Sequence, residues 1–138
     1  MYIKNFDNWN RVKKEIQSEN RKVHIRSGEV RWCVIGVNLG SEIDGKGDSY
    51  TRPVLVLHVI GSKLALVIPI TTKIKTVPGY YEFKFHDKNH CLCLNQIRVI
   101  SSKRLLKRKG RITKNRLFEI KNLMANFYSL PKGDENKK

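Results

Sequence analysis

Several features that many proteins rely on are scarce or missing in this sequence. Only three of the 138 residues are cysteines, an odd number, so reduced thiols in the cytoplasm are expected rather than disulfides. No apolar run approaches the ~20 residues of a membrane span, and no apolar segment after residues 1–7 resembles a signal peptide. The sequence contains no P-loop, dinucleotide fingerprint, Ser-His-Asp pattern or internal repeat. The cysteine count and the lack of a span or signal peptide predict a cytoplasmic protein.

Acidic residues are also in short supply. Twelve Asp and Glu stand against 28 Lys and Arg, which gives a formal net charge of +16. Such an excess says little about the fold but favours a polyanionic partner: RNA, DNA, an acidic membrane face or an acidic protein segment. Residues 101–116 hold eight basic residues and no acid. Charged runs usually form solvated surface, but a run without any acid can also contact a polyanion. Both interpretations of this segment stay open.

Apolar residues make up 40% of the chain, enough for one core in one domain. The spacing of Phe6, Trp9, Val12 and Ile16 predicts a helix within residues 1–20 that packs against the remaining fold. A second helix is expected after Thr113, which can cap it. Alternating or β-branched runs predict strands at residues 28–37, 52–60, 63–70, 80–85 and 91–100.

Turn residues connect these strands. Gly61-Ser62 is a two-residue turn signal, so residues 52–60 and 63–70 should pair as an antiparallel hairpin. His58, inside the first of these runs, is predicted to be a buried core residue. The result is a mostly β, α+β fold: a small barrel or strongly curved sheet with a helix at each end. The polar residues 131–138 are expected to be a disordered tail.

The hairpin carries polar residues that a core strand does not need. Arg52 stands where its first strand begins, and Thr71-Thr72-Lys73 follow where its second strand ends. Pairing would bring Arg52 and Thr71 to the same rim, where a cation beside a hydroxyl can hold a phosphate. Taken alone, the pattern favours a structural alternative, in which Arg52 pairs with a loop acid and Thr71 ends a strand.

Five short motifs along the chain favour the phosphate site over the structural alternative. In the order and rough spacing of these motifs, the chain resembles the MazF/PemK family, the toxins of type II toxin–antitoxin systems. The motifs are Gly28–Trp32, Gly40–Glu42, Arg52–Leu57, Pro69–Lys73 and Asn95–Arg98. The resemblance implies a toxin domain at residues 28–130, preceded by an added helical extension and connector at 1–27. It also implies an SH3-like small barrel of the MazF/CcdB type with a C-terminal helix.

The resemblance further implies a homodimeric, ribosome-independent and sequence-specific endoribonuclease, an mRNA interferase. Family members cut single-stranded RNA without a metal or other cofactor. The RNA's own 2′-hydroxyl attacks the phosphorus, which leaves a 2′,3′-cyclic phosphate and a 5′-hydroxyl. The expected partners are single-stranded RNA and a cognate antitoxin with an acidic segment, whose complex with the toxin binds DNA.

Roles carry over to matching positions only. Arg52 matches the active-site arginine, suited to clamp the phosphorane, and Thr71 matches the catalytic hydroxyl. Asn95 stands where many relatives carry an acid, so Glu42 is the candidate base; its alternative role is a salt bridge to Arg52 or a lysine. The predicted RNA-binding residues are Thr72, Lys73, Lys75, Asn95, Gln96 and Arg98.

Two other functions remain open. The trio of catalytic residues in the PemK branch cannot be carried over, because Cys93, Ser41 and Asn95 occupy its positions. Asn95 therefore supports a catalytically inactive RNA-binding module. A CcdB-like toxin acting on DNA gyrase is the other alternative, although that branch lacks the pair formed here by Arg52 and Thr71.

Overall fold

The computed structural model describes residues 2–129, so the tail predicted at residues 131–138 lies outside the described residues. The elements, in chain order, are α1 (Phe6–Ser18), β1 (Glu29–Val34), β2 (Thr51–Ile60), β3 (Leu64–Thr71), β4 (Tyr80–Phe85), β5 (Lys88–Cys93), the 3-10 turn η1 (Leu94–Gln96), β6 (Arg98–Ser101), the 3-10 turn η2 (Ser102–Arg104), β7 (Leu105–Arg111) and α2 (Lys114–Phe127). None of the helices within residues 2–129 is long and apolar enough to cross a membrane.

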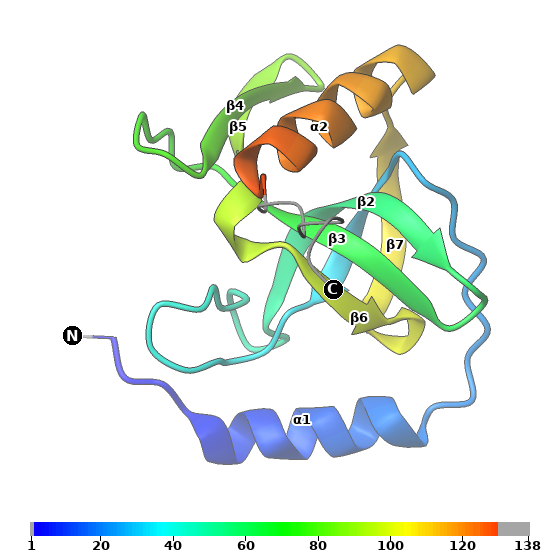
Figure 1. Ribbon diagram of the computed structural model, residues 1–138. Coiled ribbons are helices and arrows are strands. Elements are labelled where there is room, and N and C mark those ends of the chain that lie inside the picture. The colour runs from blue at the N-terminus through cyan, green and yellow to red at the C-terminus, as the bar shows by residue number, and fades with distance from the viewer. Residues whose placement is uncertain (1, 130–138) are drawn as a thin grey trace, which may run out of the picture.

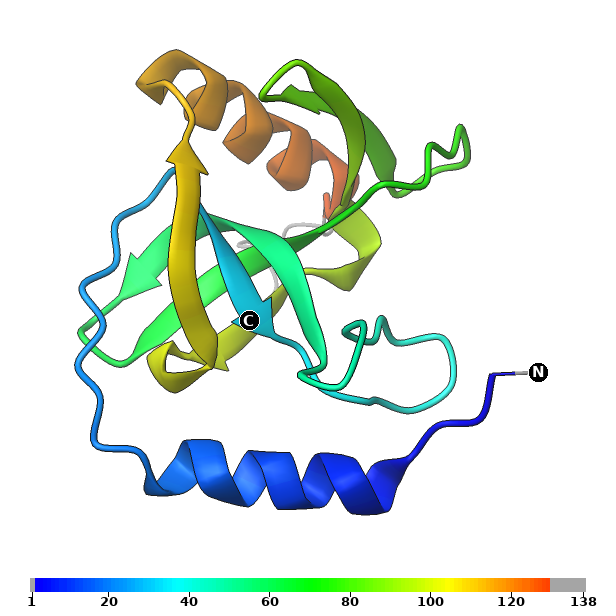
Figure 2. The same cartoon turned by 180° about the vertical axis from the view of Figure 1, so that it is seen from behind.

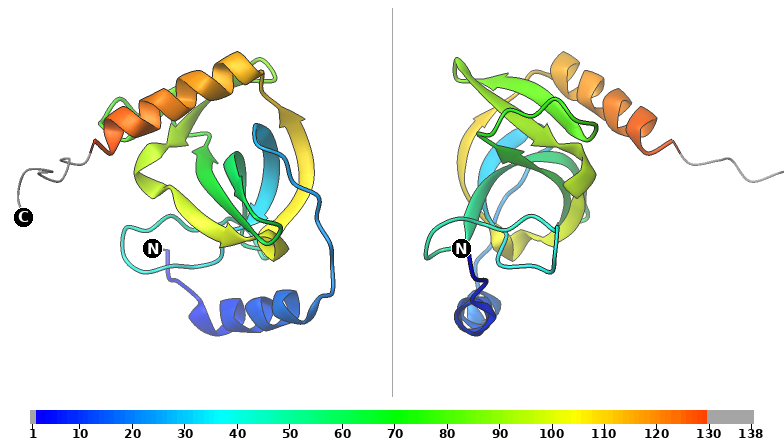
Figure 3. Two further views of the ribbon diagram at one scale, coloured as in Figure 1. Left: turned by 45° about the vertical axis from the view of Figure 1, so that its right-hand side comes forward. Right: turned by 90° about the vertical axis from the view of Figure 1, so that its left-hand side faces the viewer.

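The seven strands form one antiparallel sheet in the order β4-β5-β3-β2-β1-β7, and β6 pairs with β3. The sheet curls strongly, as the two views of Figure 3 show, but no ladder within residues 2–129 closes it. Helices α1 and α2 lie at opposite ends of the curled sheet (Figures 1 and 2). The predicted α+β class is therefore confirmed, with an open, barrel-like sheet.

Strand β2 is the centre of the sheet and is buried on both faces. Leu55 and Leu57 join the core beneath α2, while Val54 and Val56 join a second cluster inside the curl. This explains why the strand reads as a continuous apolar run rather than an alternating one. Its hairpin with β3, predicted from the turn at residues 61–62, is confirmed by the antiparallel register that begins at Val54 opposite Pro69.

Two strand predictions were wrong. Residues 91–100 do not form one strand, because the chain turns through η1 and divides them between β5 and β6. Each half pairs with a different end of β3, and this allows the sheet to curl. Residues 105–111 form a strand, β7, that the sequence did not predict. Its middle residues are exposed and basic, which suits an edge strand and hides the usual apolar alternation.

The expected burial of His58 was also wrong, since the side chain is exposed. The β2–β3 register shifts between Val56 and His58, where Leu57 forms a bulge. The extra residue moves His58 off the face of Val54 and Val56, and Val59 packs against their cluster instead. Prediction from strand alternation assumes an unbroken register, so it does not locate such a shift.

The predicted N-terminal helix is confirmed as α1, and Trp9 attaches it to the sheet. The Trp9 side chain is 6% exposed and meets the Tyr50 ring edge-on at 5.5 Å between centroids. Gly36 lies beneath the indole with φ 85°, and an added Cβ there would come within 2.3 Å of the ring. Only glycine therefore allows the helix to approach this closely.

Among residues 2–129, Glu29 is the most deeply buried charged group, with 4% exposure. Its carboxylate accepts a hydrogen bond from the Arg26 amide at 2.8 Å and lies 3.1 Å from Arg31 and 3.6 Å from Arg108. The side chain thus joins the connector after α1 to strands β1 and β7. A buried charge with this many partners is costly to leave incomplete.

Replacing Glu29 with glutamine is expected to lower the free energy of unfolding by about 3 kcal/mol, because Arg31 then keeps a buried charge without its counterion. Urea denaturation measures the difference. The matched control is Glu119→Gln, on an exposed position of α2. Equal midpoints for the two variants would show that the Glu29 network contributes no net stability.

Candidate functional site

The β2–β3 hairpin brings Arg52 and Thr71 to the same end of the sheet. Val54 pairs with Pro69, so two further residues along each strand lead to Arg52 and Thr71. Both continue the face whose inner residues, Val54 and Val56, fill the cluster within the curl. The predicted rim is therefore present, and its two polar side chains stand at the edge of an apolar core.

Arg52 is half-buried and held by the loop that precedes β2. Its Nε donates a hydrogen bond to the Asp44 carbonyl at 2.9 Å. Burial lowers the pKa of the guanidinium, an effect that nearby Cys93, Asp44 and Tyr80 oppose. An arginine so perturbed still keeps its charge at neutral pH, and its terminal nitrogens are left to bind an anion.

Thr71 offers a positioned hydroxyl. The residue is 7% exposed, and its Oγ1 accepts a hydrogen bond from the Lys73 amide at 3.2 Å. Because the oxygen is the acceptor in this bond, the hydroxyl hydrogen stays available to donate. Thr71 also pairs with Cys91 of β5, which holds the backbone at the end of β3.

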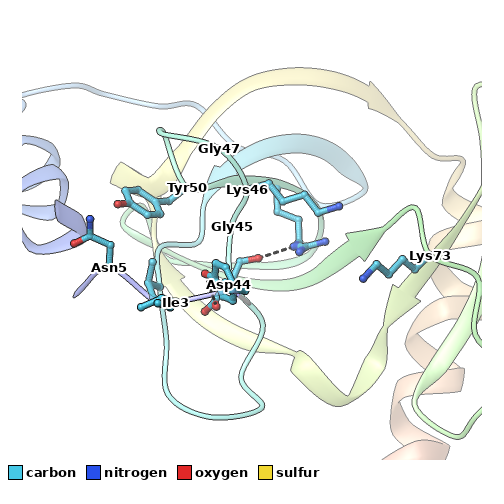
Figure 4. A pocket seen from close by; sticks show the side chains of 11 residues that line it. Ile3, Asn5, Asp44, Gly45, Lys46, Gly47, Tyr50 and Lys73 are labelled. Atoms are coloured by element: carbon cyan, nitrogen blue, oxygen red, sulfur yellow. Dashed lines mark hydrogen bonds between the residues drawn. The ribbon is translucent and has the colours of Figure 1, made fainter. Parts of the chain in front are cut away.

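A cavity of about 600 Å³ opens in front of Arg52, and we call it the arginine cavity. Figure 4 shows Asp44, Lys46 and Lys73 around it, and its dashed line marks the bond from Arg52 to the Asp44 carbonyl. The complete lining is Tyr2, Ile3, Asn5, Val37, Asp44, Gly45, Lys46, Gly47, Tyr50, Arg52 and Lys73. Its size lies within the range of ligand sites, and its charged lining is mainly cationic.

The remaining predicted residues fall into other places. Glu42, Asn95, Gln96 and Arg98 line a second cavity of about 430 Å³ on the other side of the same loop. Gln96 accepts from the Ile43 amide and donates to the Ser41 carbonyl, both at 3.0 Å, so it holds the loop. Glu42 is exposed and accepts from the Leu39 amide at 3.0 Å. Glu42 and Arg52 thus line different cavities.

A third cavity of about 380 Å³ shares Arg52 and contains Thr72. Its walls include Trp32, over whose ring the Lys109 ammonium lies at 4.4 Å. Lys75 lies outside it, 4.8 Å over the ring of Tyr80. Trp32 and Lys109 were not singled out from the sequence, although each belongs to a segment that was: the first motif and the basic run.

The acid beside Arg52 is Asp44, which the sequence analysis also missed. Its Oδ1 accepts from the Asn38 amide at 2.7 Å, and its Oδ2 accepts from the Tyr2 hydroxyl at 3.1 Å. Lys4 lies 3.4 Å from the same oxygen. Both oxygens of Asp44 are therefore engaged, so the carboxylate of Glu42 is more accessible than that of Asp44.

The neighbouring thiols do not supply a base. Burial raises the pKa of Cys93 to about 11, although Arg52 opposes the shift. Burial likewise raises the pKa of Cys33 to about 12. Both therefore remain neutral thiols near pH 7, so neither acts as a thiolate beside Arg52.

Most of the chain matches the model of one known protein family. Residues 26–128 match a family model described as PemK-like, MazF-like toxin of type II toxin-antitoxin system. No curated protein matches the chain.

Several solved structures share the fold. A MazF from Deinococcus radiodurans is 20% identical, with a TM-score of 0.62 over 78% of this chain and 99% of its own. An endoribonuclease with its cognate antitoxin, from a Mycobacterial species, is 17% identical, with a TM-score of 0.56 over 80% and 100%. The Mycobacterium tuberculosis toxin MazF-mt6 is 14% identical, with a TM-score of 0.54 over 75% and 99%. At these identities the likeness concerns the fold.

Proposed function

Since this chain belongs to the family of PemK-like, MazF-like toxins of type II toxin–antitoxin systems, we propose that it cleaves single-stranded RNA as a metal-independent, ribosome-independent endoribonuclease. The observation that carries the proposal is the β2–β3 register, which leads to Arg52 and Thr71 at the same end of the sheet, where Arg52 lines a cavity with a mainly cationic lining. A net charge of +16 adds the general attraction to a polyanion.

The proposed reaction needs little covalent chemistry from the protein. The 2′-oxygen of the RNA attacks the adjacent phosphorus, the bond to the 5′-oxygen breaks, and a 2′,3′-cyclic phosphate and a 5′-hydroxyl result. Arg52 holds the oxygens of the phosphorane with the nitrogens that its bond to Asp44 leaves available. Thr71 donates its hydroxyl hydrogen to a non-bridging oxygen. Water supplies the proton that the leaving 5′-oxygen takes.

Glu42 is the proposed base for the 2′-hydroxyl. Its exposure supports this role, and it lies only two residues from the carbonyl that holds Arg52. The second cavity, with Asn95, Gln96 and Arg98, would then hold the RNA on the side of the attacking ribose. Lys73 and Lys75, both exposed, extend the cationic track beyond Thr71 and Thr72 for the backbone.

The proposed partners follow from the same charges. A cognate antitoxin would cover the cationic cavities with an acidic segment, as a complex of toxin and antitoxin is known for one protein of similar fold. A homodimer is proposed from family membership. Together these proposals describe a cytoplasmic toxin that its antitoxin silences by occupying the RNA site.

The test is incubation of the purified protein with a long single-stranded RNA in EDTA, followed by analysis of fragment ends. Discrete cuts with cyclic-phosphate ends are expected at a limited set of sequences. In the same assay Glu42→Gln should cut more slowly by about 10²-fold, the usual contribution of a general base. Asp44→Ala is unsuitable as a control, because the Asp44 carboxylate also contacts Tyr2, Lys4 and the Asn38 amide.

Absence of cleavage by well-folded protein would contradict the proposal, and so would cleavage that EDTA abolishes. Unchanged cleavage by Glu42→Gln would remove Glu42 from the mechanism but leave the nuclease intact. That result would indicate that Arg52 and Thr71 act without a dedicated base.

A further inference from the structure

The segment that precedes α1 lies against the arginine cavity. We call residues 2–5 the N-terminal arm. Tyr2, Ile3 and Asn5 line that cavity together with Arg52 and Lys73. Figure 4 shows Ile3 and Asn5 near Asp44 and Tyr50. The extension therefore reaches the candidate site, although its sequence pattern favoured packing against the sheet over a recognition role.

The arm is attached at several points. The Asn5 side chain caps α1 by accepting from the Asn8 amide at 3.0 Å, and Trp9 anchors the helix behind it. The Lys4 ammonium donates to the carbonyls of Asn38 and Gly40, and it lies 3.4 Å from Asp44. Only 22% of the Lys4 side chain is exposed. A lysine enclosed by three oxygen acceptors is a fixed contact rather than a solvated charge.

The loop that Lys4 holds is the loop that holds Arg52. Asp44 accepts from the Asn38 amide through its carboxylate and from Arg52 through its carbonyl. A continuous set of contacts therefore runs from Lys4 through Asp44 to the guanidinium. Loss of Lys4 would loosen the loop on the arm side, where only the Tyr2 hydroxyl would still bond Asp44, while Gln96 would still hold the loop on the other side.

The exposed side chains of the arm are suited to a nucleobase. Tyr2 is 67% exposed and Ile3 is 80% exposed, yet both belong to the lining of a cavity that also contains the cations Lys46, Arg52 and Lys73. An aromatic ring beside cations is the arrangement that binds single-stranded nucleic acid, with a base on the ring and a phosphate on the charges. The Tyr2 hydroxyl bonds to Asp44, which orients the ring.

We propose that the N-terminal arm is part of the RNA site, where Tyr2 stacks on a base next to the cleaved phosphate and Lys4 is a positioning residue for the Arg52 loop. The inference rests on the proposed endoribonuclease function and deepens it, because it assigns part of the substrate recognition to the extension outside the residues matched by the family model.

The experiment separates binding from cleavage. Binding is measured by fluorescence anisotropy with a 2′-fluoro RNA, which lacks the attacking hydroxyl. Cleavage is measured with the matching RNA, as separate kcat and KM. Tyr2→Ala should weaken binding by about 5- to 150-fold, the measured range for loss of one base–aromatic stack. Tyr2→Phe keeps the ring and should restore most of that affinity.

Lys4→Met should reduce kcat by about 10- to 100-fold with a smaller effect on binding, because it loosens the loop that positions Arg52. Lys4→Arg, which keeps a cation, should recover part of the rate. Lys14→Met removes the same charge from an exposed position of α1 and is the matched control. Thermal unfolding of each variant shows that the fold is retained.

Each outcome bears on the proposal. If Tyr2→Ala binds RNA with the affinity of the wild type and cuts at the same positions, the proposed role of the arm is overturned, while the proposed nuclease activity stands. If Lys4→Met lowers the melting temperature and the loss of rate is explained by that instability alone, Lys4 is a structural contact and not a positioning residue. An RNA that binds through Tyr2 but is never cut would support the arm and contradict the nuclease. Neither binding nor cleavage by the folded wild type would overturn both.

Discussion

Arg52→Ala is expected to reduce kcat for RNA cleavage by about 10³-fold or more, the largest effect of any single change in this protein. The guanidinium is the half-buried cation at the rim, and its position is set by the Asp44 carbonyl. Alanine removes the charge from the place where the phosphorane gathers negative charge, and water is a poor substitute because it is not preorganised. The measurement is single-turnover cleavage at saturating protein.

Arg52→Lys provides a stringent comparison. It retains the charge but loses both the planar fork and the geometry that allows one nitrogen to bond the loop while others bind the substrate. A rate close to that of Arg52→Ala would assign the effect to geometry. Arg11→Ala, at an exposed surface position on α1, controls for the loss of one positive charge. Wild-type cleavage by Arg52→Ala would place the reaction elsewhere.

Thr71→Val is the second large effect, with an expected fall in kcat of about 10²-fold. Valine has the shape of threonine, so the buried end of β3 keeps its packing, while the hydroxyl that can donate to a phosphate oxygen is lost. The substitution also leaves the Lys73 amide without its acceptor, which explains why stability must be followed by thermal unfolding alongside the rate.

Thr71→Ser should recover much of the activity because it restores the hydroxyl. Thr76→Val removes a hydroxyl from an exposed position further along the segment after β3 and is the matched control. Equal rates for Thr71→Val and the wild type would limit Thr71 to holding the Lys73 amide, and Arg52 would then act with another donor.

The parts of the fold that were predictable from sequence depend on contacts between close neighbours in the chain. The helix at Phe6–Ser18 follows from apolar residues three and four apart and from the Asn5 cap. The β2–β3 hairpin follows from two apolar runs and a two-residue turn. Once that hairpin is known, the meeting of Arg52 with Thr71 at one rim follows from counting residues, without any knowledge of the remaining fold.

Other features escaped prediction because their causes lie far away in the chain. The bulge at Leu57 is a property of the β2–β3 pairing, and it takes His58 off the face of Val54 and Val56, where Val59 packs instead. Residues 91–100 are divided because β5 pairs with one end of β3 and β6 pairs with the other. Strand β7 exists because β1 offers a free edge, which no local pattern in a basic segment reveals.

The sequence by itself determined the charge, the α+β class, the central hairpin and the residues that identify the family, since each is written in composition, periodicity or local spacing. Only the tertiary structure decided that Asp44 rather than Glu42 lies beside Arg52, and that Lys4 reaches the same loop. The physical reason is that backbone carbonyls, amides and a loop's path set these contacts. Lys4 and Asp44 are 40 positions apart in the chain, and the docking of Trp9 over Gly36 anchors the helix that brings them together.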